Sequence, residues 1–191
     1  MIVSAWLGTA SRTSLVSILL RGVQIAIVAL IIVWVVLLGG LRFTPTPKGD
    51  GNDTGLLFNW HPLLMTLAFI VCMGEAVLAY KAPVLRLSDR PARKTWHVTM
   101  HTAAFVLGSL GIVAAIQSHN LKRPNPVPNF YSTHSFLGLL VCSMLVLQAS
   151  LGMMAFVAPR WSVQTRQEFR PVHGFAGLFI LITGIGTMAV S

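Results

Sequence analysis

Charged residues are scarce in this sequence, and acidic residues are the scarcest of them. Asp and Glu contribute only 5 of the 191 residues, and all charged residues together make up 10%, whereas roughly 25% is typical of a soluble globular domain. Hydrophobic residues make up 54%, and the mean hydropathy is +0.73. This composition excludes an ordinary water-soluble domain and predicts an integral membrane protein.

Cysteine is also rare, and the two that occur, Cys72 and Cys142, both lie inside apolar segments. Their placement favours buried thiols over a disulfide framework. The formal net charge of +9 does not indicate nucleic-acid binding, because the 14 Lys and Arg residues occur in short segments between apolar runs and form no continuous basic face. We therefore expect no nucleic acid among the partners.

Long apolar runs dominate what is present. The first run has neither charge nor histidine; it is too long for a signal-peptide core and close to the roughly 20 residues that span a bilayer as a helix. None of the runs shows the alternating pattern of a barrel strand. We predict an all-α membrane protein, with residues 1–191 forming a single membrane domain of five transmembrane helices. Their approximate ranges are 22–41, 59–80, 95–117, 130–158 and 171–191.

Basic residues are distributed unevenly between the two sides of such a chain. The amino-terminal segment 1–21 and the loops 81–94 and 159–170 together carry ten Lys and Arg, and the two remaining loops carry four. The positive-inside rule therefore places the amino terminus in the cytoplasm, with helix 22–41 as a peripheral anchor. The same topology puts the glycosylation pattern Asn52-Asp53-Thr54 outside.

Histidines stand near the start of each of the last four runs. Helix parity places His61 and His134 near the outer face, and His97, His101 and His173 near the cytoplasmic face. Ionisable side chains are costly inside a membrane and usually mark a site. Four helices that each present an imidazole at matched depth meet the requirement of two bis-histidine haems in a four-helix bundle.

The choice between His97 and His101 depends on depth, because both lie on the same helical face. His97 stands three residues after Lys94, and His173 stands three residues after Arg170. Equal depth favours His97 as the partner of His173, with His101 one turn deeper beside the haem edge or filling space.

Other interpretations of these histidines stay open at this point. The faces that carry them are rich in Gly and Ala, which also lets membrane helices approach closely while single histidines bond across helices. A zinc site is disfavoured, because it needs about four converging ligands. A proton relay that uses the histidines and Glu75 remains an alternative.

Four motifs in this order and spacing resemble the cytochrome b561 family of ascorbate-dependent transmembrane di-haem cytochromes. They are Phe58-Asn59-Trp60-His61-Pro62-Leu63, the Lys-x-x-His-x-x-x-His pattern from Lys94 to His101, Tyr131-Ser132-Thr133-His134-Ser135, and Arg170-Pro171-Val172-His173.

The resemblance implies that residues 59–191 form a haem-binding four-helix core with two b-type haems, one held by His61 and His134 and the other by His97 and His173. It implies electron transfer from cytoplasmic ascorbate to monodehydroascorbate or a ferric chelate on the opposite side, with membrane lipid and a second copy of the chain as further partners. The residues expected to contact substrate are Lys81, Arg86, Arg90, Arg93, Lys94 and Arg170 on the cytoplasmic side and His119 in the outer loop.

The chain departs from the family in one respect, since the family usually has six spans and five are predicted here. The resemblance therefore implies a shortened form without the sixth helix. Two alternatives remain: a quinol-oxidising di-haem cytochrome, and a haem-free membrane scaffold. Endomembrane, vacuolar and plasma-membrane locations are all compatible with the sequence.

Overall fold

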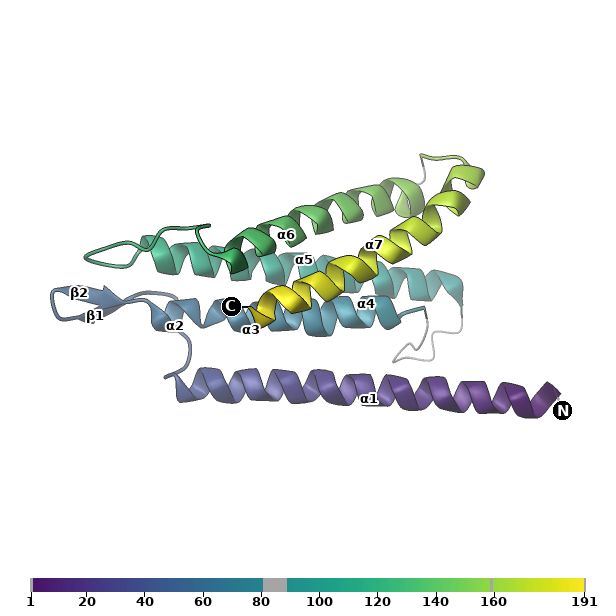
Figure 1. Ribbon diagram of the computed structural model, residues 1–191, viewed down its shortest axis with the longest axis horizontal. Helices are drawn as coiled ribbons and strands as arrows, with labels where there is room; N and C mark the ends of the chain where they lie inside the picture. Colours follow the sequence, from purple (N-terminus) through teal and green to yellow (C-terminus); the bar gives the residue numbers. More distant parts are fainter. Residues whose placement is uncertain (1, 81–88, 159, 191) are drawn as a thin grey trace. The chain divides into compact units, whose positions relative to one another are not determined.

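The computed structural model describes residues 2–80, 89–158 and 160–190, with side chains from residue 15 onward. Figure 1 shows a chain built of helices with one short hairpin. In chain order the elements are α1 (Ile2–Leu37), β1 (Thr46–Lys48), β2 (Gly51–Asp53), α2 (Gly55–Phe58), α3 (Trp60–Met65), the π-helical segment η1 (Thr66–Met73), α4 (Gly74–Leu78), α5 (Arg90–Asn120), α6 (Thr133–Gly152), the π-helical segment η2 (Met153–Val157) and α7 (Val163–Ala189).

Five helical stretches in the described residues are long and apolar enough to cross a membrane, which confirms the predicted all-α membrane fold. They are Leu15–Leu37, Gly55–Leu78, Arg90–Asn120, Thr133–Val157 and Val163–Ala189. The second is continuous through α2, α3, η1 and α4, and the fourth through α6 and η2.

The first helix begins well before the predicted residue 22. Arg21, which we expected just outside the membrane, lies inside the candidate span Leu15–Leu37. The apolar run predicted from residue 22 is therefore part of a longer helix, and the point at which that helix enters the membrane stays a prediction. The charge is tolerated here because Glu75 pairs with it.

Polar caps set the starts of two long helices, α5 and α7, earlier than the apolar runs suggested. The Asp89 side chain accepts a hydrogen bond from the Ala92 amide at 3.0 Å and starts α5, and Ser162 accepts one from the Thr165 amide at 3.1 Å and starts α7. Such side chains satisfy the amides that a helix start leaves unbonded. His97 and His173 therefore lie inside long helices rather than in first turns.

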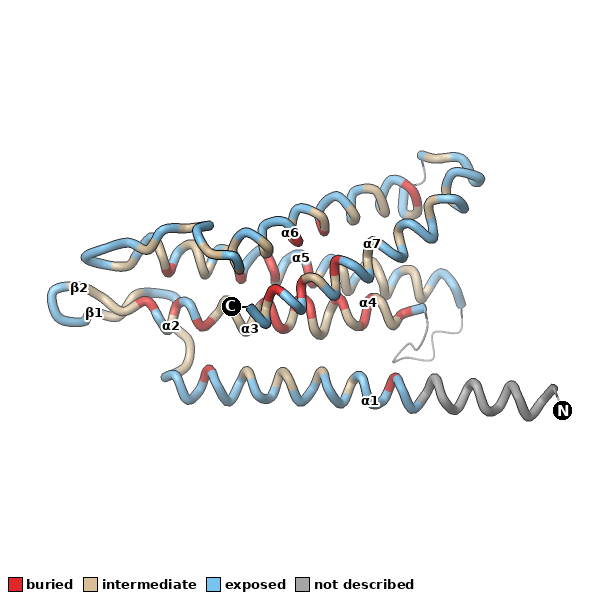
Figure 2. The backbone as a smooth tube through the Cα atoms, viewed as in Figure 1, coloured by how far each residue is buried: buried red, intermediate tan, exposed pale blue. Residues whose placement is uncertain are grey.

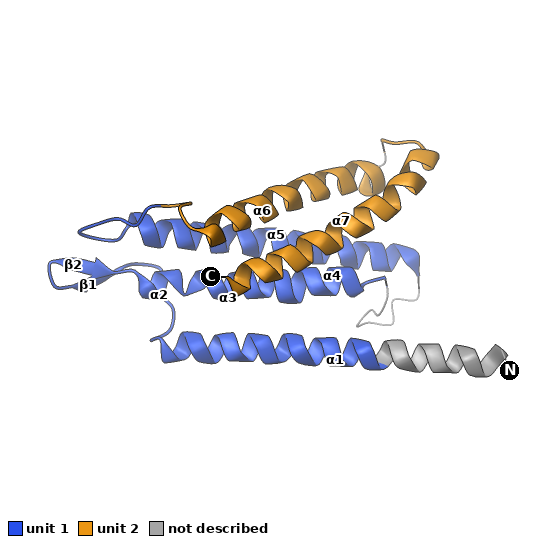
Figure 3. Ribbon diagram, in the orientation of Figure 1, with its two compact units in different colours: residues 1–128 blue, residues 129–191 orange. Residues whose placement is uncertain are grey.

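The chain divides into two compact units, residues Met1–Pro128 and Asn129–Ser191 (Figure 3). In the first unit, α5 packs against α3 and η1, and α1 packs against η1 and α3. In the second unit, α6 packs against α7.

The core of the first unit combines small and large side chains: Ala68, Ala76 and Ala104 are buried, and so are Phe69 and Met73. By contrast, most of α1 is exposed along its described length (Figure 2), and large side chains such as Ile25 and Leu30 are 70% and 68% exposed. In a helix that spans a membrane, such an apolar surface faces lipid.

Candidate functional site

His61 lies in α3 and contacts the middle of α5. Its ring Nδ1 is 3.0 Å from the carbonyl oxygen of Gly111. Close approach is possible because Gly111 has no side chain: an added Cβ would lie 3.3 Å from Leu64 Cβ and 3.6 Å from the His61 carbonyl oxygen. The small residue therefore lets α5 carry its backbone up to the histidine.

His97 lies in α5 and contacts the end of the preceding span. Its Nδ1 is 2.8 Å from the carbonyl oxygen of Ala76, which belongs to the last turn of the short helix α4. Carbonyl groups in a last turn lack intrahelical donors, so the imidazole supplies one. The Tyr80 ring lies 5.5 Å from the His97 ring, and the His101 ring lies edge-on to it at 4.5 Å.

His134 lies in the first turn of α6, where the prediction placed it. The cap that starts this helix is Ser132, whose side chain accepts a hydrogen bond from the Ser135 amide at 3.2 Å. The ring Nδ1 of His134 is 2.9 Å from the carbonyl oxygen of Thr187, near the end of α7. His134 thus joins the start of α6 to the end of α7 within the second unit.

His173 lies in α7, among aromatic side chains. The rings of Phe156 and Phe169 are 5.4 and 5.9 Å from its ring. Gln148 on α6 donates a hydrogen bond to the His173 carbonyl oxygen at 2.6 Å. A Cβ added to Gly152 would lie only 2.9 Å from His173 Cε1, so a glycine at this position makes room for the imidazole.

Three of the four predicted ligands therefore share one local arrangement, in which Nδ1 faces a backbone carbonyl oxygen. A carbonyl can only accept a hydrogen bond, so the proton must be on Nδ1, and in the neutral ring Nε2 then carries the lone pair. This is the tautomer that metal-ligating histidines adopt, with the second nitrogen fixed by a hydrogen bond to the protein. His61, His97 and His134 fit axial ligation of haem iron in this respect.

In the part of the chain that the structure describes, no three His, Cys, Asp or Glu side chains gather to hold a metal ion between them. Haem needs only axial ligands from the protein, because the macrocycle supplies the other ligands to the iron. A single imidazole whose Nδ1 is already bonded to a backbone carbonyl oxygen can serve as such a ligand.

Glu75, the acidic residue considered for a proton relay, is paired with Arg21. The guanidinium binds both carboxylate oxygens, with Nε 2.7 Å from Oε1 and Nη2 3.1 Å from Oε2. The side chains are 21% and 9% exposed, so the pair is partly buried, and removing one partner would leave the other charge uncompensated in apolar surroundings. The pair explains an acidic residue inside a membrane helix without a relay.

One turn along α1 from Arg21, the Gln24 side chain makes a second polar contact with the same span. Its Nε2 donates a hydrogen bond to the Ile70 carbonyl oxygen at 2.8 Å, within the π-helical segment η1. The same atom lies against Gly74, where a side chain would collide with it. Residues three apart share a helix face, so Arg21 and Gln24 hold α1 to one side of the second span.

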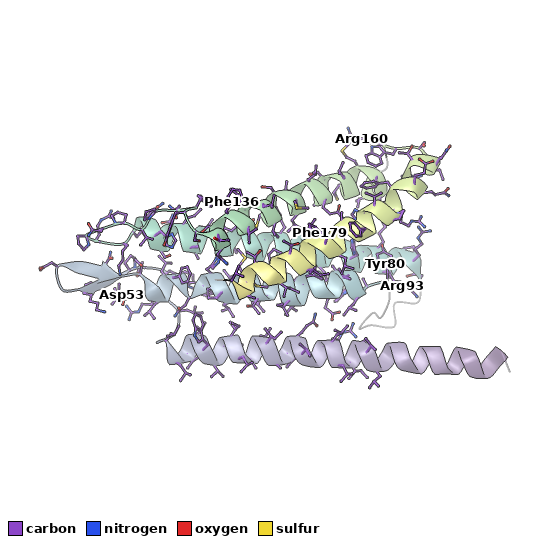
Figure 4. All side chains as sticks on the ribbon, viewed as in Figure 1. Asp53, Tyr80, Arg93, Phe136, Arg160 and Phe179 are labelled. Atoms are coloured by element: carbon purple, nitrogen blue, oxygen red, sulfur yellow. The ribbon has the colours of Figure 1, made fainter. Side chains whose placement is uncertain are left out.

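The predicted substrate residues of the cytoplasmic side are only partly described. Lys81 and Arg86 lie outside the described residues. Arg90, Arg93 and Lys94 lie in the first turns of α5 rather than in a loop. Tyr80 and Arg93 stand at the same end of the first unit, at the end of the second span and the start of the third (Figure 4).

Cations in the first turns of a helix oppose the helix dipole, which favours anions there. Helix stability therefore does not account for Arg90, Arg93 and Lys94, and their positive charge adds to that of the helix start. Arg170 is exposed in α7. A strongly positive helix start attracts anions and, equally, the cytoplasmic membrane surface.

At the opposite end of the first unit, His119 lies in the last turn of α5 and not in the loop that we predicted. Its ring stacks on Phe58 with centroids 6.2 Å apart and planes 7° from parallel, and Phe58 in turn lies 5.5 Å from the His61 ring. Phe58 occurs in one of the four sequence motifs but carried no predicted role, although its position three residues before His61 places both on one face.

Asn52 links the hairpin to the chain that follows α5. Its Nδ2 donates to the Leu121 carbonyl oxygen at 2.8 Å, and its Oδ1 accepts from the Arg123 amide at 2.9 Å. The neighbouring Asp53 accepts a hydrogen bond from the Gly55 amide at 2.8 Å, and this bond, assisted by nearby lysines, lowers the pKa of the carboxyl group. The predicted glycosylation pattern is therefore part of a hydrogen-bonded junction.

The fold defines a multi-pass helical membrane protein with histidines on four of its five spans. A family model described as eukaryotic cytochrome b561 matches residues 60–191. The chain belongs to the eukaryotic cytochrome b561 family, as the four motifs predicted.

Three relatives illustrate the similarity. Transmembrane ascorbate ferrireductase 1 of Arabidopsis thaliana is 36% identical over 152 residues, which cover 80% of this chain and 59% of the relative. Plasma membrane ascorbate-dependent reductase CYBRD1 of Xenopus laevis is 37% identical over 73% of this chain and 49% of the relative. Lysosomal membrane ascorbate-dependent ferrireductase CYB561A3 of Bos taurus is 35% identical over 70% of this chain and 49% of the relative. The chain thus spans between half and three fifths of the length of these relatives.

Proposed function

We propose that this protein carries electrons across a membrane, from ascorbate on the cytoplasmic side through two b-type haems to monodehydroascorbate or a ferric chelate on the other side. The observation that carries the proposal is the shared state of His61, His97 and His134, whose Nδ1 protons are each fixed on a backbone carbonyl oxygen. The names of the relatives support ascorbate as donor and ferric iron as acceptor.

The pairing of the ligands follows from the sequence: His61 with His134, and His97 with His173. When bound, haem supplies an iron centre that gains and loses single electrons, a chemistry that the polypeptide itself lacks. The carbonyl oxygens of Gly111, Ala76 and Thr187 hold three of the rings in orientation and raise the basicity of the ligating nitrogen. The four-helix core 59–191 supplies the apolar surroundings, and helix α1 packs against its first span, at α3 and η1.

Ascorbate is an anion at neutral pH, so its site requires cations and hydrogen-bond donors. Arg90, Arg93 and Lys94 supply them at the start of α5, close to His97 in sequence. Lys81, Arg86 and Arg170 complete the proposed basic surface. The amino terminus is cytoplasmic in this proposal, because the ends rich in Lys and Arg stay inside.

On the opposite side, we propose that the acceptor meets His119. Phe58 lies between the His119 and His61 rings, with its own ring within 6.2 Å of each. The aromatic ring excludes water between the proposed acceptor site and the ligand, while His119 offers a hydrogen bond at the surface. Relatives named for the plasma membrane and the lysosomal membrane leave either location open to this chain.

The full chain, purified in detergent with its cofactor, tests the proposal directly. We expect a reduced-minus-oxidised spectrum of b-type haem, rapid reduction by ascorbate, and reoxidation by a ferric chelate. A purified, folded chain without b-type absorbance would reject the proposal in favour of a haem-free scaffold. Reduction by a quinol but not by ascorbate would reject the proposed donor.

A further inference from the structure

The ion pair between Arg21 and Glu75 lies immediately beside the hydrogen bond that fixes His97. Glu75 and Ala76 are neighbours in α4, and the Ala76 carbonyl oxygen accepts from His97 Nδ1 at 2.8 Å. Glu75 is held from the other side by both Arg21 contacts, at 2.7 and 3.1 Å. A short path of contacts therefore runs from α1 through the end of the second span to the histidine in α5.

The end of the second span needs such support. Helix α4 (Gly74–Leu78) is the last part of the continuous second span, and its last carbonyl groups have no intrahelical donors. It follows η1, whose π-helical hydrogen bonding differs from that of the helix on either side. Arg21 and Gln24 hold this segment at Glu75 and at the Ile70 carbonyl, which fixes the direction of the carbonyl groups between and beyond them.

Packing of apolar side chains alone does not explain why α1 carries these two polar residues. The described part of α1 has few buried side chains, and its large apolar residues are exposed. An arginine in a membrane helix is costly unless it is paired. The polar contacts of Arg21 and Gln24 thus determine where α1 attaches to the second span. The contact of Arg21 lies next to Ala76, at Glu75.

We infer that the Arg21–Glu75 ion pair is a positioning device for His97: it holds the Ala76 carbonyl oxygen against Nδ1 and so sets the redox potential of the haem that His97 ligates. The inference rests on the proposed function. A hydrogen bond from Nδ1 to a carbonyl increases the basicity of the ligating nitrogen, which favours oxidised iron. Loosening that bond shifts the potential upward.

Redox titration of the purified haem-loaded chain, followed by absorbance and by the EPR signal of the ferric haem, tests this inference. The variants are Arg21→Gln, Glu75→Gln and Arg21→Lys, the last of which keeps the charge but loses the planar two-point contact. We expect each to raise the midpoint potential of one haem, the same one that His97→Ala removes. The other haem should keep its potential.

The direction of the shifts separates positioning from a simple field effect. If only the charges mattered, removing the cation and removing the anion would shift the potential in opposite directions, and that result would overturn the inference. So would potentials and EPR signals that stay at wild-type values in all three variants. The charge-swapped variant Arg21→Glu/Glu75→Arg should return toward the wild-type potential, and a swapped protein that binds haem but keeps the raised potential would contradict us.

A matched control neutralises another ion pair of the same unit. Lys48→Gln/Asp53→Asn removes the exposed contact of 3.7 Å in the hairpin, far along the chain from His97, and should leave both potentials unchanged. Failure of the proposed haem binding gives a different result, because the wild-type chain would then contain no haem to titrate. Failure of ascorbate as the donor would leave the haems present and the redox titration interpretable.

Discussion

The α-carbon of Gly152 faces the ring of His173 so closely that a methyl group there would lie 2.9 Å from Cε1. Substituting Gly152→Ala therefore requires the imidazole to move away from α6. Overpacking of this kind costs about 1–3 kcal/mol. We expect the variant to lose the haem proposed for His97 and His173, measured as the haem-to-protein ratio of the purified chain.

Gly138 provides the control on the same helix. A methyl group at Gly138 would lie 3.9 Å from Thr187 Cγ2, which is an ordinary contact. Gly138→Ala should retain its full haem content. Equal haem content in the two variants would show that Gly152 serves only the packing of α6 against α7.

His97 and His101 share a face of α5, and we expect only His97 to ligate iron. Its Nδ1 is held by the Ala76 carbonyl oxygen, which prepares Nε2 for a metal. His97→Ala should abolish one haem, whereas His101→Ala should retain both and alter the spectrum slightly, because the rings are in contact at 4.5 Å. Loss of a haem in the His101 variant alone would reverse the assignment.

The cationic start of α5 should control the reaction with ascorbate. Arg93→Gln/Lys94→Gln removes two charges, and hydrogen bonds to charged groups contribute about 1.5–3 kcal/mol each, so reduction by low ascorbate concentrations should slow by roughly tenfold or more. Stopped-flow absorbance measures this rate. Lys48→Gln/Lys122→Gln, at the other end of the first unit, should reduce at the wild-type rate. If both double variants behave alike, Arg93 and Lys94 only orient the helix in the membrane.

The sequence was sufficient to predict five membrane helices because each apolar run is long enough to span a bilayer by itself. It also drew attention to the histidines, since an ionisable residue near the start of an apolar run is conspicuous, and their role as haem ligands stays a prediction. The starts of α5 and α7 were missed, because Asp89 and Ser162 lie in polar segments where the apolar pattern gives no signal.

Contacts between distant residues were beyond the reach of sequence patterns. Arg21 and Glu75 are 54 residues apart, and each taken alone indicated something else: the end of a helix and a proton relay. The hydrogen-bond partners of the histidines are backbone carbonyl oxygens. Every residue has such an oxygen, so the residue types do not indicate which one will be the partner. Gly111 was the nearest signal, because a glycine on a histidine-bearing face permits close approach of the backbone.

The junction around the hairpin should weaken in acid. The Gly55 amide hydrogen bond, with nearby lysines, holds the pKa of Asp53 below its ordinary value of 3.8, so the charged form is stabilised in the folded protein. This contribution is complete above the ordinary value and is lost as the pH falls through the lowered pKa. NMR chemical shifts of the Asp53 carboxyl carbon and the Gly55 amide should titrate together. In Asp53→Asn the Gly55 signal should no longer titrate.

Asn52 should hold the hairpin to the segment after α5 and carry no glycan, although Asn52-Asp53-Thr54 matches the acceptor pattern. Its amide nitrogen and oxygen bond to the backbone of Leu121 and Arg123, and a glycan on the nitrogen would disrupt the first of these contacts. Wild-type protein expressed in glycosylating cells should therefore keep its gel mobility after endoglycosidase treatment. A mobility change that is absent from Asn52→Gln would contradict this prediction.

Two substitutions separate the hydrogen bonds of Asn52 from the glycosylation pattern. Asn52→Ala removes both hydrogen bonds and should lower the free energy of unfolding by about 1–3 kcal/mol, since each bond contributes about 0.5–1.5 kcal/mol. Thr54→Val destroys the acceptor pattern but keeps the Asn52 amide, and the Thr54 side chain makes no capping hydrogen bond in α2. It should remain close to wild type in thermal unfolding. If the two variants lose equal stability, the contacts of Asn52 do not hold the hairpin to the segment after α5.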